Sequence, residues 1–302
     1  MLSSEEILGL SSLLERYKAK SFGKDKVTIE TFSNLDTLES HRLTWVKKWS
    51  EETFAKLEAF NDLVVICHPD SEISSEKNCY LATDNPKALF FELIDHFFNK
   101  KPEGKIAATA VVKTDKIGKN VTIGDYCVIS EETVIGDNVT LESHVTTLGK
   151  VIIGDNVLIQ CGTAIGEASF GFFIGDDGHY HRVPHLGGVV IDHDVEIGAN
   201  SSIDRGTMQD TYIGPYTKFG NMCEVAHNVQ IGADCMMVDN VWIGGSTVVE
   251  DHVFFGPGAN LINQLRIGAN STVGMGAVVR KDVEPGSVVA GVPARPLHKE
   301  NN

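Results

Sequence analysis

Apolar residues recur at every sixth position along most of the chain after residue 104. One unbroken series runs from Ile213 to Val279, and two shorter series cover residues 117–165 and 191–203. A period of six matches neither the roughly 3.6-residue turn of an α-helix nor the two-residue alternation of a strand. It does match a coil of three short strands, each of which points one apolar side chain inward. The pattern therefore predicts a parallel β-helix of hexapeptide repeats.

Residues 1–104 follow a different pattern, which predicts a small α/β domain. The segment Ser3–Glu6 has the spacing of a capping box ahead of apolar residues, so we expect a helix to begin there. Residues 63–67 are continuously apolar and predict a buried strand, and Asn85-Pro86 predicts the start of a second helix. A polar linker is expected at residues 99–104. The predicted units are 1–104 (α/β), 105–290 (β-helix) and 291–302 (C-terminal tail).

Two breaks in the six-residue series predict longer segments between neighbouring coils. Residues 166–190 form the larger break, and a smaller shift lies between Ile203 and Ile213. Insertions in solenoids form loops on one face, which is often the binding face. The larger insertion is rich in aromatic residues and histidines, so we expect it to form one wall of a substrate site.

Charge and cysteine usage narrow the class of protein. The chain of 302 residues has a net charge of -15, which argues against nucleic acid and anionic membrane as partners. None of the six cysteines has CxxC spacing, so neither a zinc ribbon nor a thioredoxin-like site is indicated. The sequence predicts neither a signal peptide nor a membrane-spanning segment. We therefore expect a cytoplasmic protein with reduced thiols.

His227 is the strongest candidate for a catalytic base. Val225 points inward by its place in the series, so His227, two residues further on, is expected near a corner of the coil. A histidine suits the removal of an amine proton near neutral pH, as acyl transfer to an amine requires. Gly245 is predicted beside it on the next coil, where its N–H could stabilise negative charge on a thioester oxygen.

The sequence leaves open which carboxylate orients His227. Coil stacking points to Gln209 and Asp210, although the nearby shift in the series blurs that register. Asp204 and Glu224 are the other candidates.

Basic residues gather near the C-terminal end of this acidic chain. They are Arg266, Arg280, Lys281, Arg295 and Lys299. They could bind the phosphates of a pantetheine carrier or an acidic carrier protein. The alternative interpretation is scattered charge that favours solubility.

Three short motifs carry a resemblance to a known family. They are Phe170-Gly171-Phe172, Ile203-Asp204-Arg205-Gly206 and Ala226-His227-Asn228-Val229-x-Ile231-Gly232. Together with the hexapeptide series they resemble the left-handed β-helix acyltransferases, and more narrowly the UDP-3-O-acylglucosamine N-acyltransferases of lipid A synthesis. The likeness runs from about residue 104 to 297, and Asn85-Pro86-x-Ala88 is similar to that family's uridine-binding domain.

The resemblance implies a homotrimer with active sites between subunits and no metal or redox cofactor. It also implies a UDP-linked amino sugar as acceptor and an acyl carrier protein thioester as donor. In this family pattern His227 is the base and Gly245 the oxyanion donor. The expected substrate contacts are Phe170, Gly171, Phe172, Asn221, Asn228, Asp204 and Trp45, and the expected donor contacts are Arg280 and Arg295.

Some positions depart from the family pattern and keep alternatives open. Gly220 replaces the aspartate of an Asp-Asn pair, and Gln264 stands about where the family carries a second histidine. The ending after Gly291–Arg295 resembles CoA-dependent sugar acetyltransferases. An acyl- or acetyl-CoA-dependent N-acyltransferase of a nucleotide amino sugar for surface polysaccharide is therefore the first alternative.

Two further classes are more distant. The first is a β-helical zinc enzyme of carbonic anhydrase type, whose candidate ligands would be His179, His181, His185 and His227. The second is a β-solenoid with a purely structural role.

Overall fold

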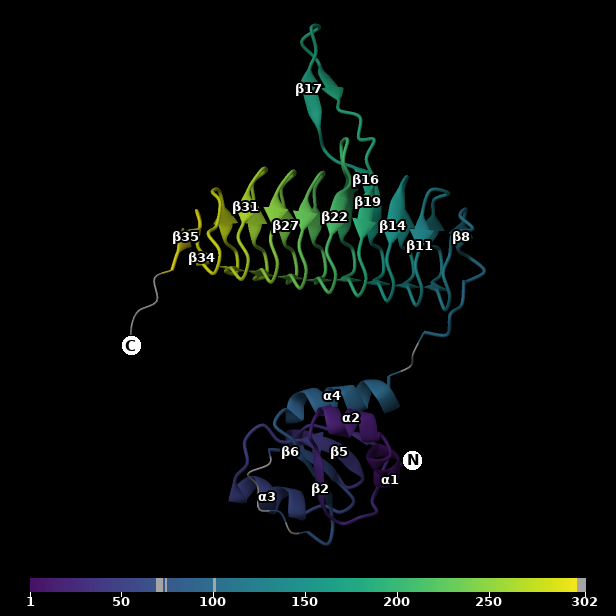
Figure 1. Ribbon diagram of the computed structural model, residues 1–302, viewed down its shortest axis with the longest axis vertical. Helices are drawn as coiled ribbons and strands as arrows, with labels where there is room; N and C mark the ends of the chain where they lie inside the picture. Colours follow the sequence, from purple (N-terminus) through teal and green to yellow (C-terminus); the bar gives the residue numbers. More distant parts are fainter. Residues whose placement is uncertain (69–72, 74, 100–101, 298–302) are drawn as a thin grey trace. The chain divides into compact units, whose positions relative to one another are not determined.

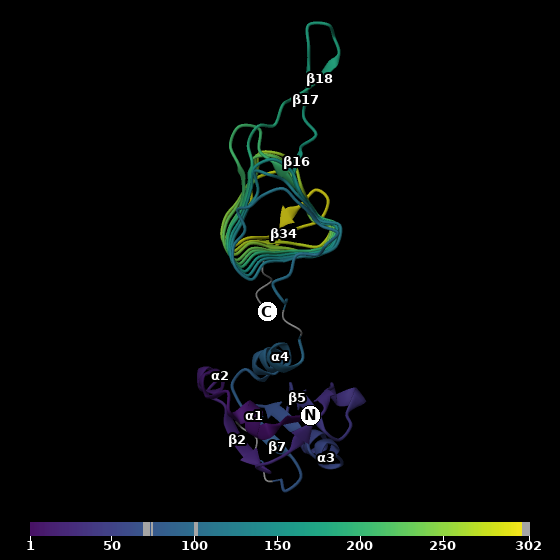
Figure 2. The ribbon, with the colours of Figure 1, turned by 90° about the vertical axis from the view of Figure 1, so that its right-hand side faces the viewer.

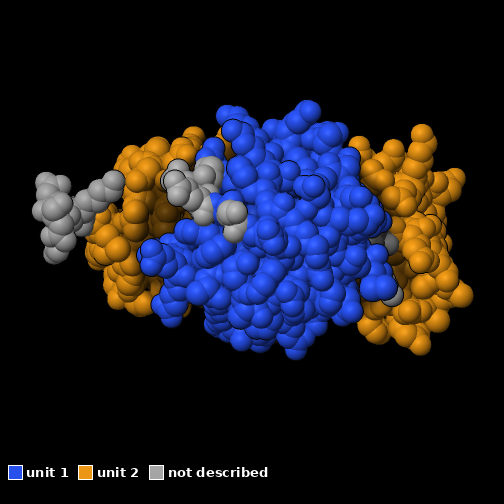
Figure 3. Space-filling view, turned by 90° about the horizontal axis from the view of Figure 1, so that it is seen from below, with its two compact units in different colours: residues 1–101 blue, residues 102–302 orange. Residues whose placement is uncertain are grey.

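The chain folds into two compact units, residues 1–101 and 102–302 (Figure 3). The structure is a computed structural model that describes residues 1–68, 73, 75–99 and 102–297. The division falls within the linker expected at residues 99–104, of which residues 100 and 101 lie outside the described part.

The first unit is a small α/β domain built on a five-stranded sheet. The sheet order is β2 (Lys20–Gly23), β7 (Cys79–Ala82), β6 (Val64–Cys67), β5 (Arg42–Trp45) and β4 (Thr31–Phe32), and β2 alone is antiparallel to its neighbour. A two-stranded pair joins β1 (Leu2–Ser3) to β3 (Thr28–Ile29). The helices are α1 (Ser4–Leu8), α2 (Ser11–Arg16), α3 (Glu51–Glu58) and α4 (Pro86–Phe97), with a 3₁₀ turn at Leu35–Thr37.

Local signals in the sequence set these elements. Ser3 caps α1 in the predicted capping box, but the chain leaves helical geometry at Leu10, so the expected first helix is two short ones. All four residues of β6 are buried, as the apolar run predicts. The side chain of Asn85 accepts the backbone N–H of Ala88 at the start of α4. No helix in the described part of the chain is long and apolar enough to cross a membrane.

The second unit is the predicted parallel β-helix, whose coils stack into a prism with three sheet faces (Figures 1 and 2). The nine-stranded sheet contains β8 (Val111–Val112), β10 (Val128–Ile129), β13 (Thr146–Thr147), β16 (Ala164–Ala168), β21 (Ser202–Arg205), β24 (Glu224–Val225), β27 (Trp242–Ile243), β30 (Asn260–Leu261) and β33 (Val278–Val279). The seven-stranded sheet contains β11 (Val134–Ile135), β14 (Val151–Ile153), β19 (Val189–Ile191), β22 (Thr211–Ile213), β25 (Gln230–Ile231), β28 (Val248–Val249) and β31 (Arg266–Ile267). The ten-stranded sheet contains β9 (Thr122–Ile123), β12 (Thr140–Leu141), β15 (Leu158–Ile159), β20 (Glu196–Ile197), β23 (Lys218–Phe219), β26 (Met236–Met237), β29 (Phe254–Phe255), β32 (Thr272–Val273), β34 (Val288–Ala290) and the antiparallel β35 (Arg295–Pro296).

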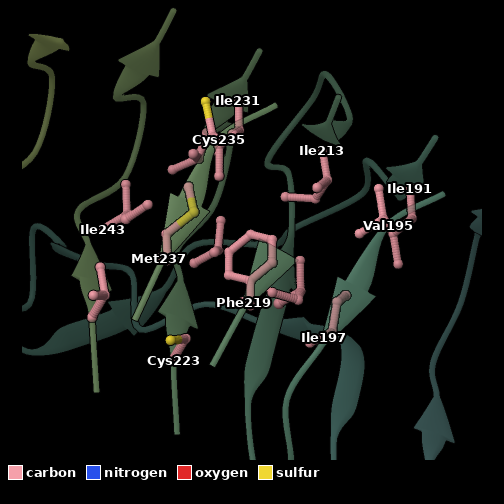
Figure 4. Packing of buried hydrophobic residues seen from close by; sticks show 14 of the residues in the cluster. Ile191, Val195, Ile197, Ile213, Phe219, Cys223, Ile231, Cys235, Met237 and Ile243 are labelled. Atoms are coloured by element: carbon pink, nitrogen blue, oxygen red, sulfur yellow. The ribbon is translucent and has the colours of Figure 1, made fainter. Parts of the chain in front are cut away.

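The six-residue series forms one continuous core inside the prism (Figure 4). Phe219, Met237 and Ile243 are examples of series members that are almost fully buried. Thr147 occupies an apolar place in the series, and its hydroxyl is paired with that of Thr133 at 2.7 Å. The pairing satisfies both buried hydroxyls, so the polar residue fits inside the coil.

Corners between strands are held by residues with left-handed backbone geometry. Asn138, Asn156 and Asn228 have φ of 58°, 59° and 60°. Asparagine tolerates this region better than most residues do. The side chains of Asn120, Asn138 and Asn156 also donate to one another along one corner, at 3.0 and 3.1 Å.

Both insertions leave the prism at the same corner. The longer one follows β16 and carries an antiparallel hairpin, β17 (Phe172–Ile174) with β18 (Tyr180–Arg182), which projects from the prism (Figures 1 and 2). The shorter one follows β21, the next strand of the nine-stranded sheet. This corner therefore combines a long loop, a short loop and the strand ends that follow.

Removing one core side chain should weaken the β-helix. Phe219→Ala is expected to lower the free energy of unfolding by about 3–5 kcal/mol, because it leaves a cavity among Ile197 and Met237. Urea unfolding followed by circular dichroism measures the loss. Lys218→Ala on the same strand is the control, because its exposed ion pair with Glu196 is worth about 0–1 kcal/mol. Equal effects of the two substitutions would contradict the assignment of Phe219 to the core.

Candidate active site

One corner of the prism brings the predicted base and its neighbour together. Ile203, Val225, Ile243 and Leu261 lie side by side on β21, β24, β27 and β30. The residues two positions further along the chain lie at the corner. There His227 contacts Gly245, and Gly245 contacts Asn263, while Arg205 lies two positions after Ile203 on β21. The short insertion begins directly after Arg205, and the long insertion begins after Ala168, which pairs with Arg205. The loops and the base therefore share one region.

The imidazole of His227 lies directly against Gly245. A Cβ atom added to Gly245 would meet His227 Nε2 at 2.6 Å and Cε1 at 2.7 Å. Real Cβ atoms do not approach so closely, so a side chain at residue 245 would displace the imidazole of His227. The N–H of Gly245 donates to Asn263 Oδ1 at 3.1 Å. An incoming oxygen could use this N–H only by sharing it with Asn263 or replacing Asn263.

Asn228 holds the other side of the imidazole. Its Oδ1 accepts the backbone N–H of Thr207 at 2.7 Å, which fixes its Nδ2 toward His227 Nδ1 at 3.0 Å. Because Nδ2 can only donate, Nδ1 is the acceptor, and the neutral ring carries its proton on Nε2. Asn228 also donates its backbone N–H to Thr211 Oγ1 at 3.0 Å. The short insertion thus fixes Asn228, and Asn228 fixes the tautomer of His227.

His185, on the returning end of the long insertion, packs against His227. Their ring centroids are 5.4 Å apart, and His185 is only 6% exposed. Leu186 and Gly187 donate backbone hydrogen bonds to the short insertion, at Thr207 and Gly206. The sequence predicts His185 as part of the histidine-rich wall of the substrate site and as a possible zinc ligand. No period or spacing in the sequence reveals its contact with His227.

Asp204 is the carboxylate whose charge acts on His227. It is buried, and Ser202 Oγ donates to it at 3.3 Å. Burial raises the pKa of its carboxyl, a hydrogen bond from Ser169 opposes that rise, and the charge of Glu224 adds to it. No carboxylate in the described part of the chain hydrogen-bonds the imidazole.

The other carboxylates proposed from the sequence have different partners or positions. Asp210 accepts Lys150 at 2.6 Å and the N–H of Gly188 at 2.7 Å. Glu224 is exposed on the outer face of β24.

These surroundings keep His227 neutral at physiological pH. Burial lowers the pKa of its imidazole, and the nearby His185 lowers it further, while Asp204 opposes both effects. A base whose pKa is below its usual range is unprotonated at pH 7, which is the state required to accept a proton.

Three of the predicted substrate contacts, Phe170, Gly171 and Phe172, lie at the base of the hairpin. Phe170 is 90% exposed, and its ring centroid is 4.9 Å from that of Phe172. Arg182 lies over the Phe172 ring at 5.3 Å. The carbonyl of Gly171 accepts the N–H of Val183 at 2.9 Å. The exposed ring of Phe170 is available to a ligand with a planar base or a sugar ring.

Asn221 lies at a different corner from His227. Its Oδ1 accepts the N–H of Ala199 at 2.8 Å, and its own N–H donates to Asp239 Oδ1 at 2.7 Å. The departure at Gly220 has a steric reason, because a Cβ there would collide with Asp239 Oδ1. Gln264 sits at a left-handed corner position with φ of 63°.

Trp45 belongs to the first unit, at the end of β5. It is partly buried, and its ring centroid is 6.3 Å from that of Phe90. Packing against the helix that contains Phe90 accounts for its position, and a uridine contact remains a prediction.

The two predicted donor-binding arginines line one hollow. Arg280 and Arg295 border a pocket of about 560 Å³ at the C-terminal end of the β-helix, with Lys281 beside them. Asp282 and Glu284 share the lining, so the hollow is not uniformly basic. Arg266 instead pairs with Glu250, and Lys299 lies outside the described residues.

The histidine-rich hairpin does not assemble a metal site. His181 Nε2 lies 2.9 Å from Asp177 Oδ1, whereas His185 packs against His227. Within the described residues of this chain, no three His, Cys, Asp or Glu side chains are grouped so that they could hold a metal ion.

Comparisons with known proteins agree with the predicted fold. Residues 116–149 match the family model described as bacterial transferase hexapeptide (six repeats), and residues 246–281 match that of the hexapeptide repeat of succinyl-transferase. The chain is 41% identical over 140 residues to a UDP-3-O-acylglucosamine N-acyltransferase of Methylorubrum populi, which is 46% of this chain and 40% of that protein. It is 54% identical over 77 residues to UDP-3-O-acylglucosamine N-acyltransferase 2 of Nitrobacter winogradskyi, which is 25% of this chain and 22% of that protein. The matches thus span two fifths or less of these relatives' lengths.

Solved structures give the handedness of the coil. LpxA from Acinetobacter baumannii aligns with a TM-score of 0.58 and 26% identity, over 64% of this chain and 73% of that one. The UDP-N-acetylglucosamine acyltransferase of Francisella novicida aligns with a TM-score of 0.56 and 26% identity, over 64% and 70%. The expected fold, a left-handed parallel β-helix of hexapeptide repeats, is confirmed.

A side chain at residue 245 should destabilise the protein only while His227 is present. Gly245→Ala is expected to lower the free energy of unfolding by about 1–3 kcal/mol, because its methyl group collides with the imidazole. In a His227→Ala background the same change should have little effect. Urea unfolding of both single variants and the double variant measures this coupling. Additive effects would show that the two residues do not touch.

Replacing Asn228 with aspartate should raise the pKa of His227. The carboxylate would accept a hydrogen bond from Nδ1–H and stabilise the imidazolium, whereas the amide donates to Nδ1. Titration of the His227 ring by NMR measures the change. Asn240→Asp is the matched control, since Asn240 has the same φ of 60° at another corner. An unchanged His227 midpoint in Asn228→Asp would contradict the contact.

Proposed function

We propose that this chain, a left-handed β-helix protein of the hexapeptide-repeat transferase type, is an N-acyltransferase of lipid A biosynthesis. The acceptor is the amino group of a UDP-linked glucosamine derivative, and the donor is a 3-hydroxyacyl thioester of acyl carrier protein. The observation that carries the proposal is the packing of the His227 imidazole on Gly245 at the corner where both loops end. The names of the relatives supply the acceptor class.

In the proposed reaction the amine nitrogen attacks the thioester carbonyl while His227 accepts a proton from the amine. The carbonyl oxygen becomes negatively charged. The N–H of Gly245 can donate to this oxygen when the same N–H is shared with Asn263 Oδ1. The C–S bond then breaks, an amide forms, and the thiolate leaves as a thiol after it takes up the proton from His227. Every atom transferred comes from the two substrates, so the reaction requires neither a metal nor a redox cofactor.

The contact with Asn228 means that the free protein holds His227 in a resting state. Its neutral ring has the proton on Nε2, the nitrogen that faces Gly245. Nε2 can accept a proton only when the ring is in the other tautomer, in which Nδ1 carries the hydrogen. We therefore place a tautomer change, with loss of the Asn228 contact to Nδ1, before proton transfer.

We also propose contacts for the substrates and for the assembly. Phe170, Gly171 and Phe172 hold the nucleotide sugar, and Arg280 and Arg295 bind donor phosphates in the C-terminal hollow. The protein acts in the cytoplasm as a homotrimer. Exposed apolar side chains on the ten-stranded sheet, such as Met236 and Phe254, support self-association through an outer face of the prism.

A donor and acceptor comparison on the purified protein tests the proposal. UDP-3-O-acylglucosamine and a UDP-4-amino sugar are each combined with 3-hydroxyacyl carrier protein and with acetyl-CoA. We expect turnover with the acylglucosamine and the carrier-protein thioester, and a loss of about 10²–10⁴-fold in kcat for His227→Ala. His252→Ala, at another exposed corner, is the control and should keep full activity.

Two outcomes would redirect or overturn the proposal. Turnover only with acetyl-CoA would assign the chain to the polysaccharide alternative. Equal turnover of wild type and His227→Ala in every combination would remove the enzymatic role of this site.

A further inference from the structure

His185 occupies a position that the proposed chemistry does not yet use. It is nine-tenths buried, and its Nδ1 has no hydrogen-bond partner within the described residues. Buried polar atoms are nearly always paired, so an unpaired one calls for an explanation. One side of the ring packs toward His227, with centroids 5.4 Å apart.

Another part of the same ring contacts the loop that contains the predicted sugar-binding residues. A Cβ atom on Gly171 would lie 3.1 Å from His185 Cε1. His185 thus lies between the Phe170–Phe172 segment and the base. Its own backbone is fixed on the C-terminal side, where Leu186 donates to the carbonyl of Thr207 at 2.8 Å. A shift of the loop at Gly171 would therefore be transmitted to His227 through one side chain.

We propose that His185 is a positioning residue, which holds the imidazole of His227 in place and couples its protonation to the seating of the long loop. The inference rests on the proposed function for its catalytic consequence. The physical contact it describes exists without any substrate. A ligand that moves the Phe170–Phe172 segment would change both the placement and the ionisation of the base.

The titratable neighbours of His227 define how this coupling acts. His185 faces it from the long loop and Asp204 faces it from β21, while Glu224 and Glu167 act on Asp204. Burial lowers the pKa of His227, the nearby His185 lowers it further, and the charge of Asp204 raises it. Removing His185 should therefore raise the pH at which His227 titrates, because burial alone would then oppose the effect of Asp204.

The test compares His185→Gln with wild type by NMR titration of the His227 ring, assigned with His227→Ala. Glutamine keeps a polar side chain but has no charge at any pH. We expect a higher His227 midpoint in His185→Gln and an unchanged midpoint in His179→Gln, which changes an exposed histidine of the same loop. Gly171→Ala provides a second variant, because its methyl group would displace His185 without touching the base, and it should also shift the midpoint.

Steady-state kinetics of the same variant measure the effect on catalysis. In His185→Gln we expect kcat to fall by about tenfold or more, since a misplaced base loses rate steeply. The acid limb of the pH profile should rise together with the NMR midpoint, and KM for the acceptor should change less than kcat does.

An unchanged His227 midpoint in folded His185→Gln and in Gly171→Ala would overturn the inference. A residue that only fills space would alter stability and leave the titration where it is. The NMR result also separates this inference from the proposed function. If the midpoint shifts but His227→Ala is as active as wild type, the coupling stands and the acyltransferase role of His227 fails.

Discussion

The parallel register between neighbouring coils is the constraint on which the rest of the structure depends. One inward side chain per strand fixes which residues lie side by side, so Val225 and Ile243 align and His227 meets Gly245. A slip of one residue would exchange inward and outward side chains and bury polar groups in the core. The core therefore determines the geometry of the site, although no core side chain takes part in it.

The residues of the candidate site lie at a corner of the β-helix. A corner residue can face solvent and a ligand, whereas a strand residue either enters the core or lies on a sheet face. Both insertions end at the corner of His227, and their backbones bond to each other between Gly187 and Gly206. Asn228 then links the short insertion to the imidazole. The base is thus held by the stack on one side and by loops on the other.

Periodicity predicted the β-helix and the pairing of His227 with Gly245, because both follow from fixed spacing. Periodicity did not predict the contacts of residues near the two insertions, where the six-residue spacing is interrupted. Coil stacking pointed to Asp210, but the inserted residues shift the register and Asp210 binds Lys150 instead. The contact of His185 with His227 and the bond of Asn263 to Gly245 were not predicted, since loop packing and side-chain hydrogen bonds have no sequence period. Gly245 was assigned an oxyanion role from its place in the coil, and the structure adds that a side chain there would displace the imidazole of His227.

The central claim is that His227 is the base and that its surroundings keep it neutral at pH 7. The most direct test measures the acid limb of kcat/KM for the wild-type protein and the NMR titration of His227 in the same buffer. In the free enzyme the two report the same ionisation if His227 is the base. The account predicts that the two midpoints coincide, below the usual range for histidine, because burial and His185 lower the pKa. An acid limb well separated from the His227 titration would show that another group accepts the proton.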